Sequence, residues 1–259
     1  MVVNMPRYSD VVQGIFQELN ELRRNPSGYA NKLEHFLSQY HGSVRHRPEE
    51  VPVVTKEGPE AVNEAIAVLR ERTAPLRTFT WSEALSSAAQ GHANDLGPKG
   101  LVGHKSSVSE KSLQERLDGY GKWSGHLVEV LDFGAVSAVE IVCSLLVDDG
   151  MPTREHREGL LTADLRQVGI GFGPHEEQRT MAVIILASKF QESTEYERLT
   201  ASTEVLEGTW EAKNWMEGAV KLTCEVSSET EGDVMRKRVT KRWEMADGSE
   251  RVTEEIIYN

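Results

Sequence analysis

Apolar residues recur at helical spacing through the first half of the chain. The first stripe consists of Val12, Ile15, Phe16, Leu19 and Leu22. It predicts an amphipathic helix that the preceding Ser-Asp pair can cap. The same spacing predicts further helices over residues 29–37, 60–72, 83–95 and 112–120. Residues 41–59 are rich in Pro and Gly and are predicted to form a loop, with a short extended piece at 51–54.

The pattern changes after residue 120. Residues 121–125 are predicted to form a turn, and residues 127–131 have strand character. An apolar stripe at helical spacing then predicts a helix that ends before Asp148. Residues 168–173 and 181–189 are predicted to pair as a hairpin through a polar loop.

The composition changes again after Phe190, where a polar and acidic stretch begins. Residues 219–226 and 234–245 alternate between apolar and polar positions, which predicts two strands. Asp247-Gly248 is a hairpin signal, and residues 251–258 after it are predicted to form a third strand that runs back along the second. These features predict a three-stranded antiparallel β meander. We therefore divide the chain into two parts. Residues 1–190 form one domain with an N-terminal helical region. Residues 191–259 form a linker and a three-stranded β tail, and we expect this tail to pack against the first domain or against a partner.

Charge and cysteine content narrow the class of protein. The 259 residues carry a net charge of −12, which argues against a nucleic-acid or anionic-membrane binder because such surfaces are basic. No run reaches the roughly 18–20 apolar residues of a membrane span, and no secretory signal is visible. Cys143 and Cys224 are the two cysteines, too few for a disulfide framework. We expect an intracellular, cytoplasmic protein.

Candidate chemistry gathers between residues 138 and 161. The predicted helix ends at Asp148-Asp149-Gly150, and His156 follows within a few residues. Carboxylates and a histidine delivered to one loop can form a site, but acidic residues before glycine also simply end helices. We expect Asp149 to bind turn amides or to pair with Arg154 or Arg157. His92 is expected to be a core or boundary residue of its helix.

Several short motifs, taken in chain order, resemble one known family. They are Leu19-Asn20-Glu21-Leu22-Arg23, Phe79-Thr80-Trp81-Ser82-Glu83-Ala84-Leu85, Ala88-Ala89, His92-Ala93-Asn94-Asp95, Gly103-His104, Glu115-Arg116-Leu117, Tyr120-Gly121, Glu129, His156-Arg157 and Val168-Gly169-Ile170-Gly171. With these motifs, residues from about 15 to 190 resemble the CAP superfamily of cysteine-rich secretory, antigen 5 and pathogenesis-related-1 proteins, also called SCP-like, in its microbial and protist branch. The resemblance implies an α+β fold, a three-layer α-β-α sandwich, and does not cover the appended β meander.

The resemblance also implies a cavity lined by two histidines and two acidic residues. Carried over by position, these are His104, Glu129, Asp148 and His156. Such a set suits Zn²⁺ with an open position for water. Two departures weaken this expectation: Val130 stands where the family usually has Asn, and Asp148 is shorter than the frequent Glu.

Three functions remain open from the sequence. The first is a non-enzymatic binding or scaffold component of a larger intracellular assembly, with a cytoskeletal or ciliary location and with the C-terminal tail docking a protein partner. The second is a zinc-dependent hydrolase or protease-like activity at the His–acid cavity. The third is lipid or sterol binding, which the resemblance also implies. We favour the first, and the lost Asn leans against an enzyme.

Overall fold

The structure, a computed structural model, describes residues 8–47, 51–193, 219–231, 234–245 and 249–258. The chain divides into two compact units, Met1–Ser193 and Thr194–Asn259. Helices and strands mix in the first unit, and the second contains an antiparallel sheet. The predicted α+β class with a C-terminal β meander is therefore confirmed.

A four-stranded sheet forms the middle layer of the first unit. Its strands are β4 (Thr80–Trp81), β5 (Gly121–Phe133), β6 (Gln167–His175) and β7 (Arg179–Glu192). They lie in the order β4-β6-β7-β5, with β4 parallel to β6 and the other neighbours antiparallel. The predicted hairpin is confirmed as β6 and β7, which puts the long β7 in the buried centre of the sheet.

The predicted turn at residues 121–125 is wrong, because these residues belong to β5. Gly121 pairs with Glu192, and Ser124 pairs with Lys189, so the end of β7 holds this segment in the sheet. The register shifts between Ser124 and Leu127, and Gly125 takes φ +81° at this irregularity. Gly125 therefore serves a bulge within a strand instead of a chain reversal.

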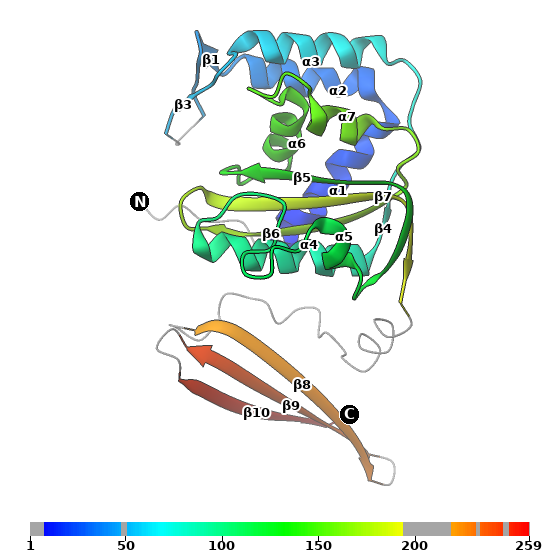
Figure 1. Ribbon diagram of the computed structural model, residues 1–259, viewed down its shortest axis with the longest axis vertical. Helices are drawn as coiled ribbons and strands as arrows, with labels where there is room; N and C mark the ends of the chain where they lie inside the picture. The colour runs from blue at the N-terminus through cyan, green and yellow to red at the C-terminus, as the bar shows by residue number, and fades with distance from the viewer. Residues whose placement is uncertain (1–7, 48–50, 194–218, 232–233, 246–248, 259) are drawn as a thin grey trace. The chain divides into compact units, whose positions relative to one another are not determined.

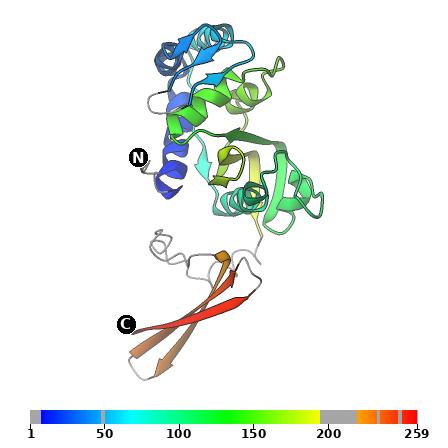
Figure 2. The same cartoon turned by 90° about the vertical axis from the view of Figure 1, so that its left-hand side faces the viewer.

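Helices cover both faces of this sheet. The longer ones are α1 (Tyr8–Arg24), α2 (Pro26–Leu37), α3 (Pro59–Glu71), α4 (Glu83–Leu96) and α6 (Ala138–Val147), and the shorter ones are η1 (Gly97–Lys99), α5 (Leu113–Leu117) and α7 (Glu155–Leu161). Helices α4 and α5 lie on one face, whereas α1, α6 and α7 lie on the other with α2 and α3 outside them (Figures 1 and 2). This is the predicted α-β-α layering.

The segment between α2 and α3 contains more structure than predicted. Three short strands, β1 (Tyr40–His41), β2 (Val44–Arg45) and β3 (Val53–Val54), pair antiparallel as a small sheet. The predicted extended piece at 51–54 contains β3, but β1 and β2 were predicted to be loop. Two-residue strands carry too little alternation for the sequence pattern to show them.

Close packing of α4 on β6 depends on two glycines of β6. A Cβ atom on Gly169 would lie 2.1 Å from the Leu85 carbonyl carbon, and one on Gly171 would lie 2.4 Å from the Gln90 nitrogen. Backbone therefore rests on backbone, and the side chains of Ser86 and Gln90 donate to or accept from β6 amides and carbonyls. Gly169 and Gly171 therefore permit the close approach of the α4 and β6 backbones.

Two polar residues of α1 form hydrogen bonds with the backbone of the segments that precede β4 and β6. The Asn20 side chain accepts a hydrogen bond from the Phe79 nitrogen at 2.7 Å and donates to the Phe79 oxygen at 3.2 Å. Arg23 is fully buried and donates to four carbonyl oxygens, those of Arg77, Leu160, Thr162 and Leu165. A guanidinium has enough donors in a planar fork to satisfy this set.

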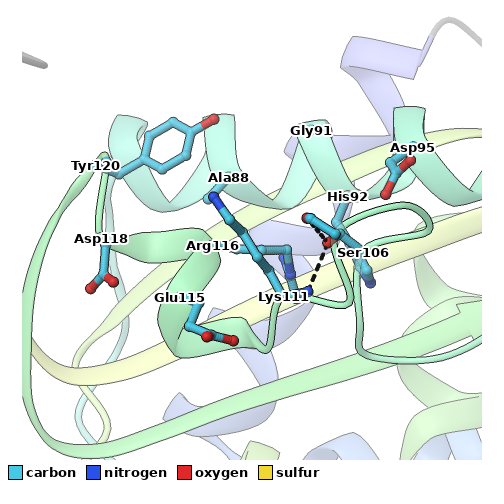
Figure 3. Close-up of a pocket in the computed structure, with 12 residues that line it drawn as sticks. Ala88, Gly91, His92, Asp95, Ser106, Lys111, Glu115, Arg116, Asp118 and Tyr120 are labelled. Atoms are coloured by element: carbon cyan, nitrogen blue, oxygen red, sulfur yellow. Dashed lines mark hydrogen bonds between the residues drawn. The ribbon is translucent and has the colours of Figure 1, made fainter.

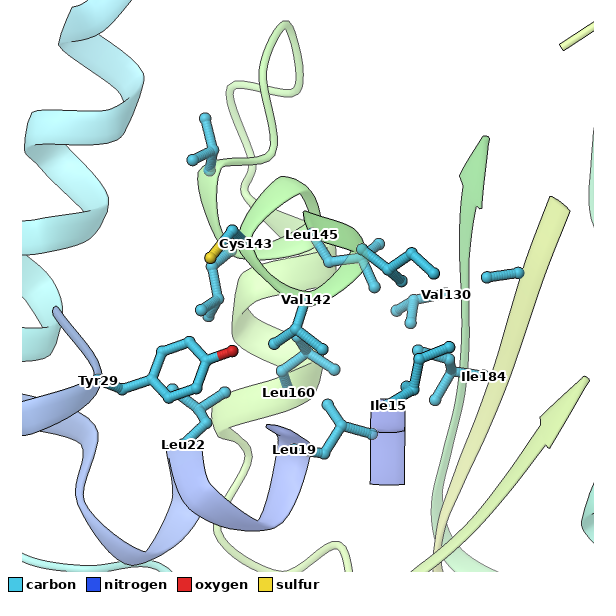
Figure 4. Packing of buried hydrophobic residues seen from close by; sticks show 14 of the residues in the cluster. Ile15, Leu19, Leu22, Tyr29, Val130, Val142, Cys143, Leu145, Leu160 and Ile184 are labelled. Atoms are coloured by element: carbon cyan, nitrogen blue, oxygen red, sulfur yellow. The ribbon is translucent and has the colours of Figure 1, made fainter. Parts of the chain in front are cut away.

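The main hydrophobic core lies between the sheet and the α1–α6 layer. Ile15 and Leu19 of α1 meet Val142 and Leu145 of α6, and Ile184 of β7 closes the cluster from the sheet (Figure 4). Cys143 is buried in this cluster as a free thiol. Burial, together with the charge of Glu18, raises the pKa of the Cys143 thiol to about 12, so it packs as a small apolar residue.

The second unit is a three-stranded sheet of β8 (Ala219–Glu231), β9 (Val234–Met245) and β10 (Glu250–Tyr258). The order is β10-β9-β8 with antiparallel pairing throughout, as predicted for the meander. The predicted Asp247-Gly248 turn and the Cys224 side chain lie outside what the structure describes. Among the described residues, no helix has the length and apolar character needed to cross a membrane.

Candidate functional site

The structure brings two of the predicted site residues together on the α4–α5 face of the sheet. His104 lies in the loop between η1 and α5, and Glu129 projects from β5. The His104 Nδ1 atom lies 2.9 Å from Glu129 Oε1. The Glu129 side chain is 2% exposed, whereas that of His104 is 55% exposed. The pair therefore joins a buried carboxylate to a histidine that solvent can reach.

Arg116 is a third member of this cluster. Helix α5 begins with a capping box, in which Ser112 and Glu115 exchange hydrogen bonds, and this short helix delivers Arg116 toward β5. Arg116 Nη2 donates to Glu129 Oε2 at 2.5 Å and to the His104 carbonyl oxygen at 3.3 Å. Burial disfavours the ionised Glu129, but the hydrogen bond with His104 and the charge of Arg116 outweigh it and lower the pKa of that carboxyl.

Asp148 and His156 form a second pair. Asp148 follows the last residue of α6 in the left-handed conformation, with φ 55° and ψ 47°. Its carboxylate accepts a hydrogen bond from the His156 backbone nitrogen at 2.9 Å, and His156 Nδ1 lies 2.7 Å from the other oxygen. His156 lies in the first turn of α7, a helix that the sequence pattern did not predict. The aspartate thus fixes the start of α7.

The two pairs lie on opposite faces of the sheet. Successive strand residues point to opposite faces, so Glu129 faces away from Val130. Val130 packs in the core beneath α6, the helix that Asp148 follows. Glu129 contacts Arg116 and His104 on the α4–α5 face. The predicted tetrad is therefore present as two separate pairs, and no contact between the pairs is found in the described part of the chain.

This division bears on the predicted zinc ion. A catalytic zinc site uses three protein ligands, and a structural site uses four. Within the described residues, no three His, Cys, Asp or Glu side chains form a group that could hold a metal ion. Each pair supplies at most two ligands, and Arg116 already neutralises Glu129. The residues in this arrangement do not fit a resident zinc ion, and zinc binding stays a prediction for measurement.

His92 joins the His104–Glu129 pair from α4. It is 2% exposed, as expected for a core residue, and its Nε2 lies 3.0 Å from the Gly103 oxygen and 4.0 Å from Glu129 Oε1. Burial lowers the pKa of His92, although Glu129 opposes this shift. A carbonyl only accepts, so Nε2 carries the hydrogen, and the buried Nδ1 has no hydrogen-bond partner in the described residues.

A cavity of about 560 Å³ opens beside this cluster. Its walls come from α4, from the following loop and from α5 with the residues after it: Ala88, Gly91, His92, Asp95, Ser106, Ser109, Lys111, Glu115, Arg116, Asp118, Gly119 and Tyr120. Figure 3 shows Arg116 and Lys111 among these side chains. The dashed lines in Figure 3 mark hydrogen bonds of Ser106, which holds the loop in place.

Asp149, the other acidic residue singled out by the sequence analysis, has a structural role. Asp149 accepts from the backbone nitrogens of Lys56 and Glu57 at 2.7 and 2.8 Å, amides of a distant turn, and does not pair with either neighbouring arginine. Arg154 instead pairs with Glu57 and Glu64. Asp149 therefore anchors the loop before α3 onto the α6–α7 connection.

Sequence reasoning missed Arg116 and His92 as members of the cluster. Both occur in the motifs of the family resemblance, Glu115-Arg116-Leu117 and His92-Ala93-Asn94-Asp95. Their helical spacing shows which side of α4 or α5 each occupies. It does not show that the two helices converge on Glu129, because that depends on how they pack on the sheet.

Comparisons with known proteins give a family and two solved structures. The family described as "CAP: Cysteine-rich secretory protein family" matches residues 16–187. None of the curated proteins matches the chain.

Among solved structures, an extracellular SCP-domain protein of Bacillus anthracis is 18% identical, with 49% of this chain and 38% of that one covered and a TM-score of 0.36. An outer surface protein of Borrelia burgdorferi is 20% identical, with 54% and 97% covered and a TM-score of 0.37. The chain thus spans less than half of the length of the Bacillus protein.

Proposed function

The chain belongs to the CAP family, and from this premise we propose that it acts as a non-enzymatic binding or scaffold component of a larger intracellular assembly. The observation that carries the proposal is the second unit, Thr194–Asn259, which lies beyond the family match ending at residue 187. A separate sheet added to a family domain supplies a surface that the family fold does not need for its own core.

The strand order of this added sheet supports docking of a protein segment. Strands β8 and β10 are the outer strands, and each pairs only with β9 among the described strands. An outer strand presents a row of backbone donors and acceptors, to which an extended segment of another chain can add by strand pairing. We propose that the protein partner binds along one of these two edges.

The geometry of the first unit favours binding over hydrolysis. A zinc hydrolase needs its ligands on one ion and an open position for water. The histidine–carboxylate pairs lie instead on two faces of the sheet, and His156 takes both oxygens of Asp148. This arrangement supports a structural role for the second pair and leaves the α4–α5 cavity as a place for ligand binding.

An intracellular location, at the cytoskeleton or the cilium, is part of the proposal. The buried free thiol of Cys143 is compatible with a reducing compartment. Fractionation and fluorescence microscopy of the tagged full chain test the location. Recovery of the protein from the medium or the cell surface would contradict it.

Proximity labelling tests the scaffold role. The full chain and a truncation after Ser193 would each be fused to the same labelling enzyme and expressed at equal levels. We expect a set of proteins labelled by the full chain to disappear with the truncation. Circular dichroism of the truncated protein checks that the first unit stays folded. Identical labelled sets, or the same location for both proteins, would overturn the proposal.

A further inference from the structure

Arg116 is buried at the α4–α5 cavity with hydrogen-bond donors that the described residues do not satisfy. Its side chain is 10% exposed. Nη2 donates to Glu129 and to the His104 carbonyl, but the buried Nε and Nη1 have no partner in the described part of the chain. Buried donors are normally paired, because an unsatisfied one costs about 1–3 kcal/mol. These groups at the wall of a cavity indicate an acceptor-bearing ligand.

We propose that this cavity binds the C-terminal residues of a peptide, whose terminal carboxylate accepts hydrogen bonds from Arg116 Nε and Nη1. Guanidinium–carboxylate hydrogen bonds are charge-assisted and stronger than those between neutral groups. The site lies in the CAP unit, so it goes beyond the scaffold role proposed for the second unit.

His92 supplies the complementary feature. Its Nε2 hydrogen is directed to the Gly103 oxygen, which leaves the buried Nδ1 as an acceptor without a donor in the described residues. Burial lowers the pKa of His92 and so favours the neutral ring with this free lone pair. A peptide end carries its last amide N–H next to the carboxylate. In the proposed complex this amide donates to His92 Nδ1.

The charge of the cavity wall favours a ligand with one negative charge over a ligand with two. Lys111 and Arg116 are the basic residues of the wall, and Asp95, Glu115 and Asp118 are the acidic ones. Lys99 pairs with Asp95 at 2.7 Å, and Ser112 binds Glu115 in the capping box. Arg116 pairs with Glu129, so Lys111 faces the charges of Glu115 and Asp118 and the wall is weakly negative. A carboxylate is a better match to this field than a phosphate dianion, which the acidic residues would repel.

The size and the apolar part of the wall favour a peptide end over a small organic acid. The volume of about 560 Å³ lies within the range of about 300–1,000 Å³ that is typical of sites for drug-sized ligands. Ala88, Gly91 and the Tyr120 ring give the wall an apolar portion beside the charged groups. Such a wall can bury the side chain of the last residue.

Isothermal titration calorimetry of the full chain tests the assignment. The probes are N-acetyl-Ala-Ala-Xaa peptides with Xaa Leu, Phe, Ser or Lys, the same peptides as C-terminal amides, lactate, and inorganic phosphate. We expect at least one free-carboxylate peptide to bind, and its amide to bind at least about tenfold more weakly, because the charge-assisted hydrogen bonds are lost. Lactate and phosphate should bind more weakly than that peptide.

Variants separate this site from general effects. Arg116→Gln should weaken binding at least about tenfold, and Lys111→Gln should weaken it less. Lys105→Gln, in the same loop but not in the cavity wall, is the matched control. Gly91→Leu fills the cavity without removing a polar group, since a Cβ there lies 3.7 Å from Tyr120 Oη. Gly91→Leu should abolish binding, and it tests the site independently if Arg116→Gln fails to fold.

Several results would overturn the proposal. They are no binding by any peptide at millimolar concentration, equal binding of acids and amides, tighter binding of phosphate or lactate, or unchanged binding by Gly91→Leu. None of them affects the proximity-labelling test, which depends on the second unit. The two proposals can therefore fail independently.

Discussion

Asp148 holds His156 twice, through the backbone nitrogen at 2.9 Å and through Nδ1 at 2.7 Å. The aspartate sits at the end of α6 with φ 55°, and the histidine lies in the first turn of α7. The pair therefore joins α6 to α7 across the turn between them. A residue that both adopts a left-handed conformation and caps the next helix is sensitive to two different substitutions.

Asp148→Ala should lower the free energy of unfolding by about 2–4 kcal/mol, from left-handed backbone strain and lost buried hydrogen bonds. Asp148→Asn keeps an amide oxygen and tolerates the left-handed region, so its loss should be about 1 kcal/mol. Urea unfolding measures both. If the two variants are equally destabilised, the backbone conformation at this position is not what the alanine changes.

Asp132 should make the protein less stable as the pH rises from the unfolded pKa of its carboxyl to the folded pKa. The residue is buried on β5, and burial raises the pKa of its carboxyl to about 7, although a hydrogen bond from Ser144 opposes the shift. Between the unfolded pKa of about 3.9 and the folded value, the native state binds one proton more than the unfolded state. The free energy of unfolding therefore falls with increasing pH across this window.

Asp132→Asn removes this proton linkage. The variant should gain on the order of 2–4 kcal/mol relative to the native sequence at pH 8 and little at pH 4. Urea unfolding at both pH values provides the measurement, with the exposed Asp118→Asn as control. A gain that is equal at pH 4 and pH 8 would show that Asp132 does not titrate differently in the folded state.

Arg23→Lys should destabilise the protein by about 3–5 kcal/mol even though the charge is kept. Arg23 donates to four carbonyl oxygens from a fully buried position, and an ammonium has three donors without the planar fork. The neighbouring Arg24→Lys is the control, because Arg24 is exposed. Thermal unfolding distinguishes the two. Equal melting temperatures would mean that lysine can replace the fork.

Two glycine-to-alanine substitutions should have opposite effects. Gly171→Ala would place a Cβ 2.4 Å from the Gln90 nitrogen and should destabilise by about 3 kcal/mol or more, because backbone must move. Gly91→Ala, on α4, meets Tyr120 Oη at an ordinary 3.7 Å and should stabilise by about 0.5–1 kcal/mol. Chemical unfolding gives both values. A stabilising Gly171→Ala would contradict the close approach of α4 to β6.

The separation of the histidine pairs predicts the outcome of a metal analysis. Protein purified without chelator should carry well below one equivalent of zinc, and a His104→Ala, His156→Ala double variant should carry the same amount. Inductively coupled plasma mass spectrometry measures both. One equivalent of zinc in the native sequence that disappears in the double variant would show that the pairs come together around an ion.

The longer helices and the central hairpin could be predicted because their information is local. The apolar stripe of α1, the N-cap at Ser82 and the apolar run of β7 each involve residues close together in the sequence. The sequence pattern alone therefore shows them. The short motif with Asn20 and Arg23 was visible as a family landmark. Its physical meaning, a set of hydrogen bonds to distant carbonyls, required the packed structure.

By itself, the sequence determined the α+β class, the family resemblance and the residue types available for a site. Only the tertiary structure decided which residues share that site. The face of β5 that carries Glu129 follows from strand register, and the packing of α4 and α5 on that face brings in His92 and Arg116. Asp148 and His156 lie on the other face because α6 and α7 pack there. Register and layer packing are long-range, so local periodicity cannot contain them.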